Sequence, residues 1–168
     1  MTMICPQLFP PAVDADAPFT TDDYYTPPWL FDVMALSFDL DVCGPRGGVP
    51  WLPATQTLST SDDGLSVEWV GRVWMNPPFS NSSPWVDRFI AHAHGVCLVP
   101  HSRAKWHSRL WATADILVDV NVMGDKLFQF YRASDGAWTN IYMPVFVAAF
   151  GAECVEAVGR LGVGRAVA

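Results

Sequence analysis

Several common features are scarce or missing in this sequence of 168 residues, and each absence narrows the possible functions. Charged residues make up only 16% of the chain and apolar residues 51%, which is typical of one globular domain with a substantial core. The chain has no uncharged apolar run of about 18 residues, so we expect no membrane span. The N-terminus has no basic stretch followed by an apolar one, so we expect no secretory signal and a cytoplasmic protein.

Familiar chemical motifs are also absent. The sequence has no Gly-x-Ser-x-Gly elbow, no Walker loop and no Gly-x-Gly-x-x-Gly fingerprint, which leaves nucleophilic hydrolases, P-loop enzymes and dinucleotide binding unsupported. His92 and His94 would lie about 200° apart on a helix, which is poor for a shared ion, and His101 and His107 lack a cysteine or carboxylate at zinc spacing, so we predict no metal site. Four cysteines stand far apart with no Cys-x-x-Cys pair, so we expect reduced thiols. They are Cys5, Cys43, Cys97 and Cys154.

The balance of charge is acidic, with a formal net charge of −7. Acidic residues gather between Asp14 and Asp63, whereas basic residues gather between Arg72 and Arg109. Proteins that grip duplex DNA usually carry a basic patch or a high isoelectric point. The sequence therefore allows a local positive face but does not predict tight, sequence-independent binding to DNA.

The most informative stretch of the sequence is Arg72–Phe79, which reads Arg-Val-Trp-Met-Asn-Pro-Pro-Phe. Its first four residues predict a short buried strand. Pro77 and Pro78 end that strand, because proline donates no backbone N–H, and they hold Asn76 and Phe79 in a stiff loop. Open α/β sheets bind their ligands at the carboxyl ends of strands, which is where this loop is expected to lie.

This loop suits methyl transfer to the exocyclic amine of a nucleobase. The lone pair of that nitrogen is delocalised into the ring, which makes it a poor nucleophile. If the Asn76 side-chain oxygen and the Pro77 carbonyl accept its two hydrogens, the lone pair is localised and aimed, while Phe79 stacks on the base. Most of the catalysis would then be positioning. A proline-rich turn without chemistry is the alternative for the motif taken alone.

The rest of the chain predicts alternating helices and strands. We expect an N-terminal arm over residues 1–19 and one catalytic domain over residues 20–168. Thr26 and Pro27 are typical of a helix start, and Ser83 with Pro84 of another. Strands are predicted at 38–43, 72–75, 95–100 and 116–120, with a loop over 49–71. Segments 126–131 and 141–150 are predicted to form a terminal antiparallel pair, joined by a turn at 133–136 and followed by a helix over about 152–160.

Three further groups of residues are candidates for binding. Asp41 ends the first predicted core strand, where a carboxylate suits the amine or the ribose of a nucleoside-like cofactor, unless it caps the following turn. Asp62 to Leu65, with Trp69, could line a purine pocket or form a solvated turn. The only basic stretch with interleaved aromatics is a candidate for contacting phosphate, or else a solvated helix face with its tryptophan in the core. Its members are Arg103, Lys105, Trp106 and Arg109.

Taken together, these blocks resemble the phage-type DNA N6-adenine methyltransferases over roughly residues 24–150. The resemblance is carried by several ordered segments at matching spacing. They are Tyr25-Thr26-Pro27 with Leu30-Phe31, Asp39–Cys43, Asp62–Leu65 with Trp69, Val73–Phe79, Trp85, Leu98-Val99-Pro100, Arg103 and Lys105-Trp106. Phe79 replaces the commoner tyrosine, and Gly44 stands where the family often has alanine. The chain also has no room for a separate target-recognition domain.

The resemblance implies an α/β, Rossmann-like class I methyltransferase fold with a mostly parallel sheet and a C-terminal antiparallel hairpin. It implies S-adenosylmethionine as methyl donor, held by Thr26, Pro27, Asp41, Cys43, Asp63 and Leu65. It also implies adenine in double-stranded DNA as substrate, with the base flipped into the site at a cost of a few kcal/mol. The same chemistry on cytosine N4, an RNA base or a protein amide, and a non-catalytic binding protein, are the alternatives.

Overall fold

The computed structural model describes residues 24–123, 126–141, 143–162 and 164–166, so the predicted arm over residues 1–19 lies outside the described residues. The strands are β1 (Tyr24–Tyr25), β2 (Phe38–Asp41), β3 (Ala54–Thr57), β4 (Val73–Met75), β5 (Gly95–Pro100), β6 (Ile116–Asp119), β7 (Val122–Met123), β8 (Lys126–Leu127), β9 (Phe130–Arg132), β10 (Ala137–Thr139), β11 (Val145–Phe150) and β12 (Gly164–Ala166). The helices are α1 (Pro28–Met34), the 3₁₀ helix η1 (Phe79–Asn81), α2 (Ser83–His92), α3 (Lys105–Thr113) and α4 (Ala152–Gly159).

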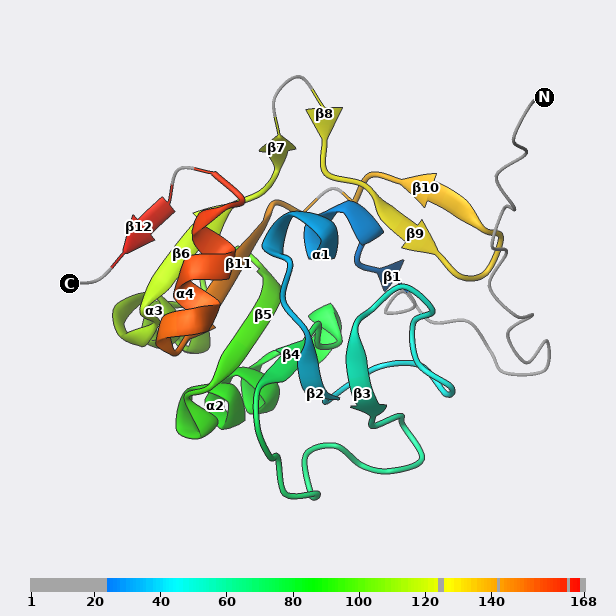
Figure 1. Cartoon of the computed structure of the whole chain (residues 1–168), viewed down its shortest axis with the longest axis horizontal. Coiled ribbons are helices and arrows are strands. Elements are labelled where there is room, and N and C mark those ends of the chain that lie inside the picture. Colours follow the sequence, from blue (N-terminus) through cyan, green and yellow to red (C-terminus); the bar gives the residue numbers. More distant parts are fainter. Residues whose placement is uncertain (1–23, 124–125, 142, 163, 167–168) are drawn as a thin grey trace.

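The main sheet is mixed and has the strand order β12-β6-β11-β5-β4-β2-β3 (Figure 1). Neighbouring strands from β3 to β5 pair in parallel, whereas β11 pairs antiparallel with both β5 and β6. The chain leaves β2 toward β3 on one side and then crosses back to β4 on the other. The order of strands therefore reverses between β2 and β4, which is the position where open α/β sheets place ligands.

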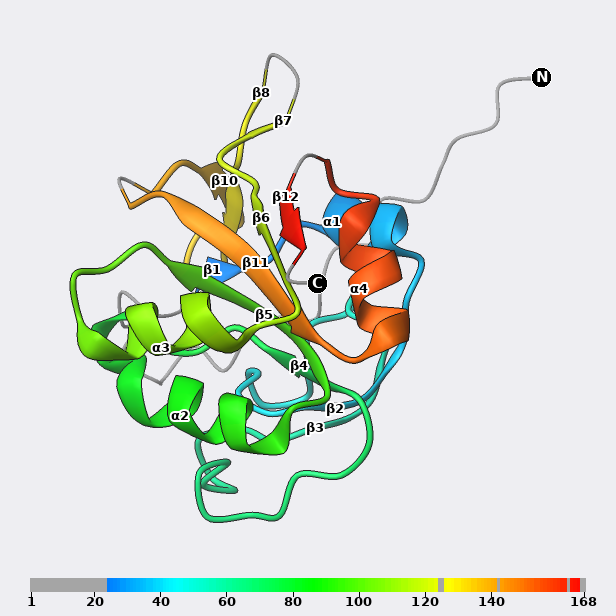
Figure 2. The same ribbon diagram turned by 90° about the vertical axis from the view of Figure 1, so that its left-hand side faces the viewer.

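Helices cover both faces of this sheet, so the domain has three layers (Figure 2). Alternate side chains of each strand enter two separate cores. One core joins the sheet to α1 and α4 and contains Phe31 packed edge-on against Trp74, with ring centroids 4.8 Å apart. The other joins the sheet to α2 and α3 around Phe89 and Trp106. None of the helices in the described part of the chain is long and apolar enough to cross a membrane.

The helix boundaries follow the proline and serine signals to within one residue. Helix α1 begins at Pro28 with Pro27 as its N-cap, one residue later than predicted. Helix α2 begins at Ser83, so its N-cap is Ser82 rather than Ser83. Both helices end on an alanine with positive φ, whose backbone N–H returns to a carbonyl four residues earlier, as in an αL cap.

The predicted terminal pairing is wrong in one respect. A hairpin does form around the turn at 133–136, but its strands are β9 and β10, and β1 joins its other edge. The long apolar segment that was expected to complete it becomes β11 and lies between β5 and β6. All six residues of β11 are buried, because the strand is covered by helices on both faces. Central strands favour such continuous apolar runs, whereas a two-stranded hairpin could not bury one.

The interval predicted as a loop, residues 49–71, contains a strand that the sequence does not reveal. Strand β3 has the sequence Ala-Thr-Gln-Thr and lies at the edge of the main sheet, where its two central residues are exposed. An edge strand of this composition lacks the apolar alternation from which strands are predicted. Its parallel pairing with β2 still fixes where the chain emerges beside Asp41.

Candidate active site

The carboxyl ends of β2 and β4 bring Asp41 and Asn76 to the same edge of the sheet. The two strands are parallel neighbours, and the Val42 N–H donates to the Trp74 carbonyl oxygen at 3.1 Å. Just beyond them, the Asn76 backbone N–H donates to the thiol of Cys43. Burial raises the pKa of that thiol, so it stays neutral and serves as an acceptor. The structure thus joins the first predicted core strand directly to the diproline loop.

Among the described residues, the side-chain amide of Asn76 has one hydrogen-bond partner. Its Nδ2 donates to the backbone oxygen of Tyr24 at 3.1 Å, and the residue is half-buried. The other end of the amide, Oδ1, accepts no hydrogen bond from the described residues. An amide whose nitrogen is bound to the protein and whose oxygen is open presents an acceptor. This is the polarity that the sequence predicts for holding an exocyclic amine.

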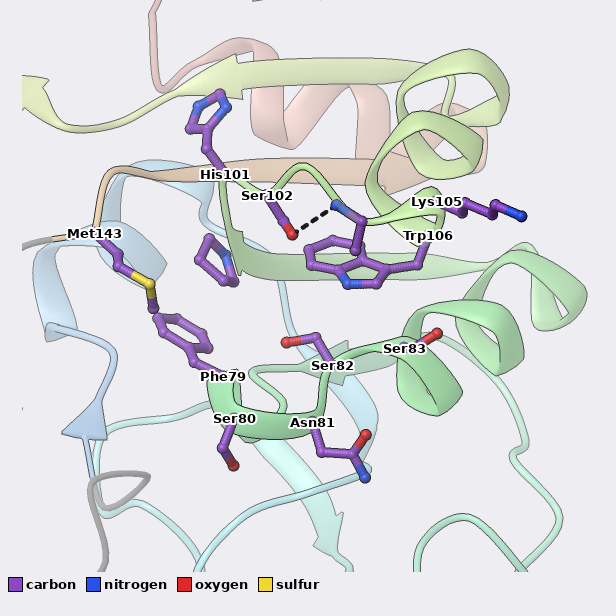
Figure 3. A pocket seen from close by; sticks show the side chains of 12 residues that line it. Phe79, Ser80, Asn81, Ser82, Ser83, His101, Ser102, Lys105, Trp106 and Met143 are labelled. Carbon is purple, nitrogen blue, oxygen red and sulfur yellow. Dashed lines mark hydrogen bonds between the residues drawn. The ribbon is translucent and has the colours of Figure 1, made fainter.

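Phe79 forms one wall of a cavity of about 370 Å³ (Figure 3). Pro77 is buried and Pro78 half-buried, and the chain then enters η1 at Phe79. The Phe79 ring packs edge-on against Phe130, with centroids 6.1 Å apart and planes at 87°. Figure 3 shows the ring extending toward Met143, across from Trp106. The diproline loop therefore borders a cavity at its Phe79 end, whereas Asn76, Pro77, Pro78 and Asp41 do not line it.

Asp41 is a buried carboxylate without a compensating charge. Its residue is 2% exposed, and it forms no ion pair within the described residues. Burial raises its pKa from 3.8 to about 7, although the Cys43 N–H, 3.4 Å from Oδ1, acts in the opposite direction. Gly44 lies so close that a β-carbon there would stand 2.1 Å from Oδ2. A cationic ligand bound beside Asp41 would therefore favour the ionised form of this carboxyl group.

Thr26 supplies a second unsatisfied polar group near this edge. The residue is 3% exposed, and its Oγ1 has no hydrogen-bond partner within the described residues. Its backbone oxygen accepts the indole N–H of Trp51 at 2.8 Å, so the segment is held in place. Pro27 follows as the N-cap of α1 and is also buried. Buried hydroxyls are normally bonded, so an open one at the start of a helix indicates a place for a ligand.

The loop containing Asp63 and Leu65 lies on the carboxyl end of β2. A β-carbon on Gly64 would stand 2.2 Å from the Val42 carbonyl oxygen, so only glycine permits this approach. Asp63 is exposed, has a φ of 48° and accepts the Ser66 hydroxyl at 2.6 Å, as in a turn. The loop thus forms the solvated turn that the sequence allowed, while still bordering the end of the Asp41 strand.

Trp69 supports this loop from within the core instead of lining a purine pocket. It is 6% exposed, stacks on Trp85 and donates its indole N–H to the Gly64 carbonyl oxygen at 2.7 Å. Arg88 lies over the ring, with its guanidinium carbon 5.1 Å from the ring centroid, and donates to the Leu65 carbonyl. The position of the loop therefore depends on two side chains that contact its backbone.

Removing the indole N–H of Trp69 should loosen the loop. We expect Trp69→Phe to lower the free energy of unfolding by about 1–2 kcal/mol, because the buried Gly64 carbonyl loses its donor. Urea denaturation followed by circular dichroism measures this change. The matched control is Trp138→Phe, since Trp138 is 48% exposed and should change stability by less than about 0.5 kcal/mol. Equal midpoints for the two variants would contradict the assignment.

The predicted basic stretch is divided by the fold. Arg103 and Lys105 are exposed at the start of α3 and form no ion pair within the described part of the chain. Arg109, on the same helix, forms an ion pair with Asp87 of α2. Trp106 is 6% exposed and belongs to the core below α3, yet it also lines the cavity beside Phe79. Arg103 and Lys105 are thus the two candidates whose charge is unpaired among the described residues, while Trp106 forms part of the cavity wall.

Comparison with known proteins identifies the family of this chain. The family model described as DNA N-6-adenine-methyltransferase (Dam) matches residues 17–123, which include Asp41, the diproline loop and the whole of α3. The chain belongs to the Dam family. A relative named DNA N-6-adenine-methyltransferase, from Haemophilus phage HP1 (strain HP1c1), is 32% identical over 77 residues. That match covers 43% of this chain and 43% of the relative. No solved structure matches the chain.

The Dam-family match ends before several residues that complete the site. Phe130 supports Phe79, and Met143 closes the cavity, yet both lie beyond the matched residues. Sequence analysis also missed the Tyr24 carbonyl that orients Asn76 and the Trp51 indole that holds Thr26. Only Trp51 gave any signal, as an isolated aromatic in a proline-rich segment. Within the described residues, no group of three or more histidine, cysteine or acidic side chains could hold a metal ion.

Proposed function

We propose that this chain is an S-adenosylmethionine-dependent methyltransferase that acts on the N6 amino group of adenine in DNA. The observation that carries the proposal is the open Oδ1 of Asn76 at the edge it shares with the buried carboxyl of Asp41, bordered by the Phe79 cavity. Membership of the Dam family and the name of the phage relative support adenine as the target. The parallel β3-β2-β4-β5 block supports the class I methyltransferase fold.

The residues at the β2–β4 edge fit the proposed cofactor. S-adenosylmethionine carries an ammonium and a sulfonium cation, and when bound it supplies an electrophilic methyl group. Asp41 provides the buried anion that such a cation requires, and the unsatisfied hydroxyl of Thr26 can accept or donate one hydrogen bond. Pro27 and Cys43 lie beside these two groups in the chain, while Asp63 and Leu65 border the end of β2. We assign the cofactor to this set of six residues.

The diproline loop would position the adenine amine. Asn76 Oδ1 accepts one amino hydrogen, because Nδ2 is already committed to the Tyr24 carbonyl, and the Pro77 carbonyl accepts the other. Both contacts draw the nitrogen lone pair out of conjugation and aim it toward the Asp41 side of the site. Phe79 stacks on the ring, which contributes roughly 1–3 kcal/mol. Pro78 keeps the loop stiff, so this geometry is set before the base arrives.

DNA would approach along the start of α3. Arg103 and Lys105 are exposed at the start of α3, and Lys105 and Trp106 line the cavity that Phe79 borders. Arg109 stands further along the helix in its ion pair with Asp87. Because the protein has few free cations and a net charge of −7, its affinity for DNA should be modest and should fall as the salt concentration rises. The target base must leave the duplex to reach Asn76, at a cost of a few kcal/mol. An enzyme of this kind would work in the cytoplasm of a phage-infected bacterium.

Mass analysis of nucleosides tests the proposal directly. We expect unmethylated DNA, incubated with the protein and S-adenosylmethionine and then digested, to contain N6-methyladenine. Samples without donor and without protein serve as controls, and RNA and cytosine-rich DNA are treated in parallel. Methylation of cytosine N4 or of RNA would show that the substrate is an amine other than adenine N6 in DNA. If calorimetry showed binding of neither donor nor DNA and no methylated base formed, the chain would be a non-catalytic member of the family.

A further inference from the structure

The three-stranded sheet β1-β9-β10 has two different faces beside the diproline loop (Figure 1). Successive residues of a strand point to opposite faces of its sheet. Phe130 of β9 packs its ring against Phe79, with centroids 6.1 Å apart. Tyr131, the next residue, lies on the other face, where it is paired with Tyr25 of β1 and Trp138 of β10. The small sheet therefore supports Phe79 with one face and carries a row of aromatic rings on the other.

Four rings make up this second face, which we call the aromatic face: those of Tyr25, Trp51, Tyr131 and Trp138. Tyr25 stacks on Tyr131 with centroids 6.1 Å apart, and Trp138 packs edge-on against Tyr131 at 5.4 Å. Trp51, from the loop before β3, contacts both Tyr131 and Trp138, at 5.3 Å and 6.3 Å. Aromatic pairs at such distances stabilise one another, so the rings hold a defined arrangement.

The outer end of the aromatic face is open. Trp138 is 48% exposed, which makes it the most exposed of the eight tryptophans. Trp51 and Tyr131 are half-buried beside it, and Tyr25 at the inner end is 9% exposed. A large indole that is held at the surface by other rings is typical of a contact site, because tryptophan supplies much of the binding energy where it meets a partner.

Two hydrogen bonds join the aromatic face to the proposed active site. The Tyr24 carbonyl, which precedes Tyr25 in β1, accepts the side-chain N–H of Asn76 at 3.1 Å. The indole N–H of Trp51 is already bound to the Thr26 carbonyl at 2.8 Å, so Trp51 has only its ring left for an outside contact. A nucleotide bound at Asn76 would therefore have neighbouring nucleotides within reach of this face.

The chemistry of the aromatic face favours a base over a phosphate. Its charged neighbour Arg132 donates to both carboxylate oxygens of Asp135, at 2.9 Å and 2.5 Å, so this ion pair leaves little net charge for a phosphate. Stacking needs no charge, and every base has a π-face that an aromatic ring can contact. Flipping an adenine out of the duplex leaves a base unpaired. A protein with a net charge of −7 gains most from uncharged contacts of this kind.

We propose that the aromatic face stacks a base of the substrate DNA that is left unpaired when the target adenine leaves the duplex, with Trp138 as the outer ring. The inference rests on the proposed function for the identity of the DNA. It deepens that function by adding a contact that does not depend on phosphate: Asn76 and Phe79 hold the target base, whereas Trp138 and Trp51 hold an unpaired base beside it.

Oligonucleotides with and without bases test the aromatic face independently of methylation. A fluorescent thymidine 8-mer contains no adenine, and an abasic 8-mer has the same number of phosphates. We expect the wild-type protein to bind the thymidine 8-mer about tenfold more tightly than the abasic one. Trp138→Ala should raise Kd for the thymidine 8-mer about tenfold and leave Kd for the abasic 8-mer unchanged. Trp138→Phe, which keeps an aromatic ring, should stay close to wild type.

The salt dependence of binding separates stacking from charge. Trp138→Ala should leave the slope of log Kd against log salt unchanged, because an indole that stacks on a base releases no counterions. Val70→Ala is the control variant, since Val70 is a 55% exposed apolar residue in the loop before β4 and should leave Kd unchanged.

The possible outcomes distinguish this inference from the proposed function. Equal Kd of the wild type for the two 8-mers, binding of neither, or an unchanged Kd in Trp138→Ala with intact circular dichroism would overturn the stacking face. If Kd stayed unchanged while sedimentation showed that Trp138→Ala separates a dimer into monomers, the face would be a contact between copies of the chain. Base-dependent binding through Trp138, without any methylated base in treated DNA, would overturn only the proposed function.

Discussion

Replacing Asn76 by alanine should reduce methyl transfer to adenine by at least about 100-fold, because the amine would lose the acceptor that orients it. The fold should survive the change, since Asn76 contributes one side-chain hydrogen bond, to the Tyr24 carbonyl, worth about 1 kcal/mol. Transfer of a labelled methyl group to DNA measures the loss. Binding of S-adenosylmethionine, measured by calorimetry, should stay within about threefold of wild type, because the cofactor residues are separate.

Two further substitutions make this result specific. Asn76→Asp keeps an acceptor oxygen at the same position, so it should retain more activity than Asn76→Ala. Asn140→Ala changes an exposed asparagine far along the chain and should leave turnover at the wild-type level. Turnover of Asn76→Ala equal to that of Asn140→Ala would remove the Asn76 side chain from the mechanism. The same experiment would leave the assignment of Asp41 untouched.

The stability of the ligand-free protein should depend on pH through Asp41. Its pKa is raised to about 7 in the folded protein, compared with 3.8 for an ordinary aspartate. Between these values the folded state holds a proton that the unfolded chain has released, so stability falls as the pH rises from about 4 to 7. The shift corresponds to about 4 kcal/mol at pH 8. Asp41→Asn should lack this loss, and be more stable than wild type at pH 8 but not at pH 4.

Denaturation in urea across this pH range measures the difference between wild type and Asp41→Asn. Asp32→Asn, at an exposed position on α1, is the control and should follow the wild type. A cationic ligand placed beside Asp41 should reverse the trend, because it favours the ionised carboxylate. S-adenosylmethionine should therefore bind more tightly at pH 8 than at pH 6 and release a proton at the lower pH. A difference between Asp41→Asn and wild type that is constant over pH would contradict the assignment.

Local signals predicted the central part of the fold. The strands ending in Asp41 and Asn76 were recognisable because each is short, apolar and closed by glycine or proline. The start of α2 was marked by serine and proline, to within one residue. The order of these elements predicts two polar side chains at the carboxyl ends of strands, and in the structure these two strands, β2 and β4, are parallel neighbours.

The remaining features depend on contacts between distant segments, which no local pattern encodes. The orientation of the Asn76 amide comes from a backbone carbonyl 52 residues away. Trp69 looked like a ligand-binding aromatic, because its burial against Trp85 is decided by packing. Arg109 read as a free cation, since Asp87 lies on another helix. For β11, the apolar run was recognised correctly as a strand, but its partners were not.

The place of β11 has a consequence for synthesis on the ribosome. The residues that match the family end at 123, yet the strand that joins β5 to β6 runs from Val145 to Phe150. Until that segment emerges, the nascent chain carries two unpaired apolar strand edges, which are open to pairing with other chains. The β3-β2-β4-β5 part of the sheet must therefore wait for a late segment, and a fragment cut after residue 123 should aggregate instead of folding alone.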